Sequence, residues 1–100
     1  MKNSVNGKTF DEIFDQFARQ INPESMDKGL IYFATDDGNR WIFEFSGVSN
    51  AESYDLYMFN DSIGNCDGFE NNNGSEGVSN GCQFYEATPD QIALLKSYKQ

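Results

Sequence analysis

The stretch from residue 60 to residue 82 concentrates oxygen-bearing side chains that could hold a metal ion. It contains six Asn, five Gly and four acidic residues. Carboxylate and amide oxygens are the ligands that Ca²⁺ prefers, and the nearest approach to a ligand set is Asp61, Asn65, Asp67 and Glu70. The spacing is not that of an EF-hand, because a loop with Gly68 at its sixth position would begin at Ile63 and end at Gly74. Binding of calcium or a small ligand by this stretch is therefore one alternative, and a solvated polar loop is the simpler interpretation.

Side chains that could perform catalysis are scarce. The sequence has no His, which removes the commonest general base and the commonest metal ligand. A Ser or Cys nucleophile would need Lys or a carboxylate as its base, yet no Lys or Arg occurs between Trp41 and Leu95. Phosphate-binding, dinucleotide-binding and nucleophile-elbow motifs are absent from the sequence. A carboxylate pair for glycoside hydrolysis needs a deep cleft, which 100 residues hardly provide. We therefore expect a protein that is not an enzyme and uses no cofactor.

Cys66 and Cys82 enclose fifteen residues of this polar stretch. A disulfide between them would stabilise the fold by roughly 3 kcal/mol through loop entropy. The N-terminal residues lack the pattern of a signal peptide, and apolar runs of four or five residues are too short to cross a membrane. These features favour a cytoplasmic protein with two free thiols, although the sequence leaves the redox state of the pair open.

The negative charge of the chain is concentrated in its middle. Sixteen acidic residues against seven Lys and Arg give a formal net charge of −9. Nine of the acids lie between Trp41 and Leu95, whereas the rest of the chain has seven acids and seven bases. Nucleic acids and anionic membranes are bound through clustered cations, so we expect neither as a direct partner. The anionic middle suits a basic protein or the nucleic-acid-binding groove of one, and solubility is the competing explanation.

Eight side chains of this middle stretch are the candidate partner-binding residues. They combine acids with one tyrosine, a residue type enriched at interfaces, and they are Glu44, Asp55, Tyr57, Asp61, Asp67, Glu70, Glu76 and Glu86. Carboxylates in a row could imitate the phosphates of a nucleic acid. Nine acids are sparse, however, beside a duplex with one charge per about 1.7 Å. We expect a monomer or a weak homodimer to present these residues.

In size, charge and lack of a catalytic set, the chain is similar to inhibitors carried by phages and mobile elements, such as anti-CRISPR and anti-restriction proteins, and to toxin-immunity proteins. The likeness is one of profile and not of motif, so it assigns no residue. The leading hypothesis is a small acidic, non-enzymatic inhibitor or antidote that binds a basic protein surface. A toxin-immunity protein, a calcium- or small-ligand-binding module using residues 60–82, and an accessory subunit whose acidity serves only solubility are the alternatives.

The first element that the sequence predicts is a helix from Phe10 to Ile21. Thr9 and Glu12 have the spacing of a capping box, in which two side chains satisfy free amides of the first helical turn. Apolar residues then recur at helical spacing and form one stripe: Phe10, Ile13, Phe14, Phe17, Ala18 and Ile21. Asn22-Pro23 ends the predicted helix, because the residue before Pro avoids helical geometry.

The remaining predicted elements are strands and a closing helix. Gly29 to Gly47 indicates a hairpin that turns at Asp37-Gly38, Tyr54 to Phe59 a third strand, and Cys82 to Ala87 a last strand. Thr88 opens the closing helix with a second capping box. The irregular composition of residues 60–82 predicts a long loop.

These elements predict a single α+β domain over residues 1–100. A small antiparallel sheet of about four strands would carry the N-terminal and C-terminal helices on one face, in the order α-β-β-β-(long loop)-β-α. Trp41, Phe43 and Phe45 share one face of their strand, and Ile42 and Glu44 share the other. We expect the helices to cover the aromatic face and leave the Ile42 face partly wet.

Overall fold

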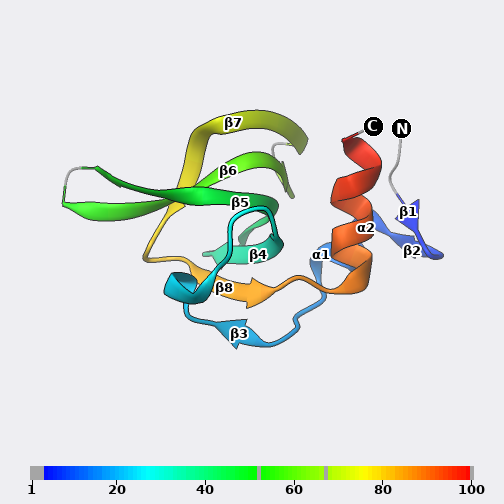
Figure 1. Ribbon diagram of the computed structural model, residues 1–100. Helices are drawn as coiled ribbons and strands as arrows, with labels where there is room; N and C mark the ends of the chain where they lie inside the picture. The colour runs from blue at the N-terminus through cyan, green and yellow to red at the C-terminus, as the bar shows by residue number, and fades with distance from the viewer. Residues whose placement is uncertain (1–3, 52, 67, 100) are drawn as a thin grey trace.

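The computed structural model describes residues 4–51, 53–66 and 68–99, which form eight strands, two α-helices and one short 3-10 helix (Figure 1). The elements are β1 (Ser4–Val5), β2 (Lys8–Thr9), α1 (Phe10–Phe14), β3 (Gln20–Ile21), η1 (Pro23–Ser25), β4 (Ile31–Asp36), β5 (Asn39–Ala51), β6 (Tyr54–Gly64), β7 (Gly68–Ser79), β8 (Gln83–Glu86) and α2 (Pro89–Tyr98). Six of these described strands form one antiparallel sheet in the order β3-β8-β4-β5-β6-β7, and β1 pairs with β2. The protein is therefore mostly β, and the prediction of an α+β domain with about four strands and two helices is wrong, because the main sheet has six strands and α1 is only five residues long.

The β4–β5 hairpin forms at the centre of the sheet, where the sequence predicts a hairpin. Asp36 pairs with Asn39, and the turn residues Asp37 and Gly38 have φ values of 51° and 89°. Two consecutive positive φ angles match the right-handed twist of the flanking strands, and Asp-Gly tolerates them. The predicted hairpin is confirmed.

The predicted loop over residues 60–82 is largely strand. β6 continues past Phe59 to Gly64, and β7 returns beside it from Gly68 to Ser79. Asn and Gly are depleted in strands, so the composition indicated a loop, but pairing with β6 overrides this local preference. Asn71 shows how the polar residues are used: it lies opposite Asp61, and its Nδ2 donates a hydrogen bond to Asp61 Oδ1 over 2.6 Å.

The predicted N-terminal helix is much shorter than its apolar stripe suggests. The capping box of Thr9 and Glu12 is present, but α1 ends at Phe14. Side chains from distant elements take the carbonyl groups at its end: Arg40 Nη1 donates to Phe14 O over 2.6 Å, and Gln91 Nε2 donates to Ile13 O over 3.1 Å. Residues 16–19 of the predicted helix are neither helix nor strand, and its last two residues, Gln20–Ile21, form β3, an edge strand that pairs with β8.

The sheet is strongly curled, and its inner side is filled by aromatic side chains. β6 and β8 are three strand spacings apart, about 14 Å in a flat sheet, yet the ring centroids of Tyr57 and Phe84 are 5.2 Å apart. The pairing register of β5 and β6 shifts on both sides of Phe45, and such bulges bend a sheet. We call this inner side the concave face. Its core consists of Met26, Tyr32, Ala34, Phe43, Phe45, Tyr57, Phe59, Val78 and Phe84.

The opposite side of the sheet, the helix face, packs against α1 and α2. Its buried core consists of Ile13, Phe14, Phe33, Ile42, Ile63, Leu94 and Leu95. Ile42 is fully buried beneath the helices, whereas Phe43 and Phe45 point to the concave face. The expectation that the helices cover the aromatic face is therefore wrong. The sequence of one hairpin does not show that the whole sheet curls, and the curl buries the aromatic side chains against one another without the helices.

The start of α2 is joined to the N-terminal segment by side-chain hydrogen bonds. The predicted capping box of Thr88 and Gln91 is confirmed. Gln91 is fully buried, and its Nε2 also donates to Gln16 O over 2.9 Å. Asp90 accepts from Asn6 Nδ2 at 2.8 Å and from Gln16 Nε2 at 2.9 Å. These bonds, which favour the ionised carboxylate, lower the pKa of Asp90 from its usual value.

Candidate functional site

A pocket of about 240 Å³ opens on the concave face between β5, β6 and β7. Trp41 on β5 and Phe59 on β6 supply its apolar wall, and Glu70 and Glu76 on β7 supply carboxylates. Ser62, Val78 and the glycines at positions 64, 68 and 77 complete the lining. We call this site the acidic pocket.

Strand pairing places both glutamates of the acidic pocket on the same side of the sheet. Glu70 lies opposite Ser62, and Glu76 lies opposite Phe59. Directly paired residues of antiparallel strands project to the same face. Both Glu70 and Glu76 are exposed, whereas Phe59 is buried. The pocket therefore combines exposed carboxylates with the buried aromatic side chain of its apolar wall.

Residue 77, which lines the acidic pocket on β7, must be Gly because the backbone of β6 passes close to it. A Cβ atom at this position would lie 2.7 Å from Tyr57 O and 3.1 Å from Met58 Cα. Both neighbours are backbone atoms of the paired strand and cannot move aside easily. Any larger residue at position 77 would push β7 away from β6 and change the shape of the pocket.

The charge of the acidic pocket is uncompensated within the part of the chain that the structure describes. Neither Glu70 nor Glu76 forms an ion pair there. A site with a negative rim and an aromatic wall suits a Lys or Arg side chain, because the aliphatic stem packs on apolar surface while the cation meets the carboxylates. A cation placed over the face of the Trp41 ring would gain a favourable cation–π contact. The lining therefore offers the groups that a cationic side chain needs.

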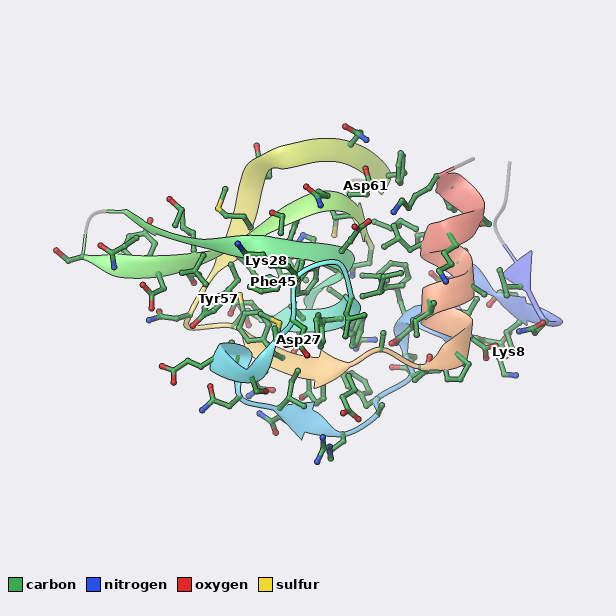
Figure 2. The ribbon with its side chains drawn as sticks, in the orientation of Figure 1. Lys8, Asp27, Lys28, Phe45, Tyr57 and Asp61 are labelled. Carbon is green, nitrogen blue, oxygen red and sulfur yellow. The ribbon has the colours of Figure 1, made fainter. Side chains whose placement is uncertain are left out.

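Glu44 and Asp61, two of the predicted partner-binding residues, lie on the helix face and are already engaged. Lys99 beyond the end of α2 forms an ion pair with Glu44, and its Nζ lies 3.4 Å from Asp61 Oδ2. Figure 2 shows Asp61 on the side of the sheet that faces α2. The hydrogen bond to Glu44 raises the pKa of Lys99 from its usual value. These two acids hold Lys99 against the sheet and do not join the acidic pocket.

Glu86, Asp55 and Tyr57 are also placed apart from the pocket. Glu86 Oε2 lies 2.8 Å from Arg19 Nη2, and Asp55 Oδ1 accepts from Asn50 Nδ2 over 3.0 Å on the projecting β5–β6 hairpin (Figure 1). Tyr57 is only 3% exposed, and burial raises its pKa; Figure 2 shows it near Phe45 in the concave core. Asp67 lies outside the described residues.

The described members of the proposed calcium-ligand set are not gathered into a site. Within residues 4–51, 53–66 and 68–99, no three or more His, Cys, Asp or Glu side chains are arranged to hold a metal ion. Asp61 is bound to Lys99 and Asn71 on the helix face, whereas Glu70 lines the acidic pocket on the concave face. Cys66 and Cys82 are free thiols, Cys66 exposed and Cys82 partly buried.

Of the residues that line the acidic pocket, sequence reasoning predicts only Glu70 and Glu76, and Trp41 is the largest of those it misses. The sequence places Trp41 on the aromatic face of its strand, but only the return of β7 beside β6 places acids near that face. The signal available in the sequence was the shared face of Trp41, Phe43 and Phe45. The pairing partner that turns this face into a pocket is a strand whose composition predicts a loop.

Comparisons with protein-family models, with curated proteins and with solved structures found no match to this chain. In the described part of the chain, no helix combines the length and the apolar character that crossing a membrane requires.

Proposed function

We propose that this protein is a small acidic, non-enzymatic inhibitor or antidote that acts in the cytoplasm by binding a basic protein surface. The acidic pocket takes a Lys or Arg side chain of that surface. The observation that carries the proposal is the contrast between the acids: Glu70 and Glu76 surround an aromatic pocket without a cation among the described residues, whereas Glu44, Asp61 and Glu86 are paired. Acidity that served only solubility would not require a pocket between two carboxylates.

The distribution of cations supports the same partner class. The ion pairs of the described residues use Lys8, Arg19, Arg40 and Lys99, and all four lie outside the cation-free stretch from Trp41 to Leu95. The lining of the acidic pocket likewise holds two glutamates and no Lys or Arg, so a basic partner would meet negative charge at the pocket itself. Such charge accelerates encounter and makes the association sensitive to salt.

Charge reversal at the pocket tests this function. The variant Glu70→Lys/Glu76→Lys changes the two pocket acids and leaves the described ion pairs intact. The matched control is Glu24→Lys/Asp36→Lys, which changes the net charge equally at exposed acids outside the pocket lining. Glu44, Asp61 and Glu86 are unsuitable for charge reversal because their loss also breaks ion pairs within the protein.

The experiment begins with capture of binding proteins from the native host at low and at high salt, and each candidate is then purified and titrated by calorimetry. We expect one basic protein to bind the unmodified chain and the control, and to bind the pocket variant at least tenfold more weakly, about 1.4 kcal/mol. Equal affinity for the pocket variant and the control would refute the proposal. The identity of the partner, a nuclease of a defence system or a toxin, separates an anti-CRISPR or anti-restriction protein from an immunity protein.

A further inference from the structure

β7 is an open edge of the six-stranded sheet. It pairs with β6 on one side, and no described strand lies on its other side. Ser79 O at the end of β7 accepts a hydrogen bond from Cys82 N over 3.1 Å, and the other backbone N–H and C=O groups on the outer side of β7 are available to another chain. Edge strands are commonly protected by Lys or Pro, and residues 68–79 contain neither. The charged residues of β7 are Glu70 and Glu76, which both line the acidic pocket.

A bulge divides this edge into two short runs. The pairing advances from Asp61 opposite Asn71 to Phe59 opposite Glu76, so β7 advances five residues while β6 advances two. One regular run is Gly68–Asn71, where Phe69 stacks on Tyr98 near the end of α2 with ring centroids 5.7 Å apart. The other run, Glu76–Ser79, has no described ring contact or ion pair with a helix. This second run is the more open place for an added strand.

The acidic pocket adjoins that run directly, since its lining includes Glu76, Gly77 and Val78. A strand added to β7 would lie about 4.8 Å away and would present alternate side chains to the pocket side. Recognition by strand addition works in this way: main-chain hydrogen bonds supply affinity, and a neighbouring pocket selects side chains. An open edge and a pocket on the same strand are the two parts of such a site.

We propose that an extended basic segment of the partner adds to β7 at Glu76–Ser79 and inserts a Lys or Arg side chain into the acidic pocket. This inference rests on the proposed function and adds the conformation of the bound segment. A second copy of this chain does not fit the same edge, because pairing of two β7 strands would place the acidic rims against each other. Like charges directly opposite destabilise a strand pair.

A defined peptide provides the test. The probe is an end-capped peptide of alternating Thr and Arg, titrated into the ¹⁵N-labelled protein and followed by NMR. We expect amide shifts centred on Glu76–Ser79 and at least a fivefold loss of affinity in Glu70→Gln/Glu76→Gln. The control Glu24→Gln/Asp36→Gln should bind like the unmodified protein. A peptide of alternating Thr and Glu should give no shifts.

N-methylation separates strand addition from simple charge attraction. In an extended chain the N–H groups of successive residues point to opposite edges, so methylation of only the Arg amides or only the Thr amides removes one row of donors. We expect one of these two isomers to bind at least tenfold more weakly than the unmethylated peptide. Equal binding of both isomers, or no binding of the unmethylated peptide, would overturn strand addition. The proposed function would survive either result if the purified partner still distinguished Glu70→Lys/Glu76→Lys from its control.

Discussion

Gln91 offers the sharpest test of how α2 is held on the fold. Its side chain is fully buried and makes three hydrogen bonds to backbone groups of other residues: to Ile13 O at 3.1 Å, to Gln16 O at 2.9 Å and from Thr88 N at 2.9 Å. The substitution Gln91→Leu keeps a side chain of similar size and removes all three bonds. It therefore isolates the polar contribution of one residue.

The expected cost follows from which backbone groups are left without a partner. Ile13 O keeps the backbone N–H of Gln16 as a donor at 3.3 Å, whereas Gln16 O and Thr88 N lose the bonds to Gln91. A buried group that loses its partner costs about 1–3 kcal/mol. Because Gln16 and Thr88 are only partly buried, water reduces the penalty, and we expect a total of about 3 kcal/mol. For a domain of this size the melting temperature should fall by about 12 °C or more.

Thermal and urea unfolding followed by circular dichroism measure this change. The control is Gln20→Leu, which introduces the same residue type at an exposed position of β3 and should change the stability by less than about 0.5 kcal/mol. If Gln91→Leu unfolds within 1 kcal/mol of the unmodified protein, buried hydrogen bonding is not what joins α2 to the end of α1.

Three further predictions concern other parts of the fold. The pKa of Asp90 is lowered in the folded state, so ionised Asp90 stabilises the fold above the ordinary Asp pKa, and this stabilisation is lost as pH falls through the folded value. In Asp90→Asn the melting temperature should therefore fall less steeply as the pH is lowered. Equal slopes for the variant and the unmodified protein would contradict this prediction. Phe84→Ala in the concave core should lower the free energy of unfolding, measured in urea, by about 3–5 kcal/mol. The control Val48→Ala, at a residue that is 54% exposed, should lower it by less than about 0.5 kcal/mol. Similar losses in the two variants would refute the placement of the core. Burial and the charge of Asp36 raise the pKa of Cys82, so mass spectrometry should show that a thiol reagent modifies the exposed Cys66 first, and faster labelling of Cys82 would contradict its partial burial.

Features fixed by a few neighbouring residues could be predicted from the sequence. The capping boxes of Thr9 and Thr88 and the Asp37-Gly38 turn depend on side chains within three residues of one another. The length of α1 could not be predicted, because Arg40 and Gln91 bind its last carbonyl groups from other elements. β7 could not be predicted because pairing with β6 stabilises a strand of poor intrinsic propensity.

The candidate site shows the same division. A lack of neighbouring cations along the chain suggested that Glu44 and Asp61 are free, but Lys99 reaches both of them across the helix face. Glu70 and Glu76 lie in the same anionic stretch and meet no such cation among the described residues. Charge along the sequence therefore identified candidate acids, and only the three-dimensional arrangement separated paired acids from those that line a pocket.

The position of α2 after all the strands has a consequence for synthesis on the ribosome. Strands β4 to β7 pair with their neighbours in the chain and can assemble as they emerge, at about 5–20 residues per second. The helix face of that sheet has only Ile13 and Phe14 of α1 to cover it until Leu94 and Leu95 have been made. During this interval the nascent chain presents an apolar surface to chaperones, and pausing before α2 would prolong its exposure to aggregation.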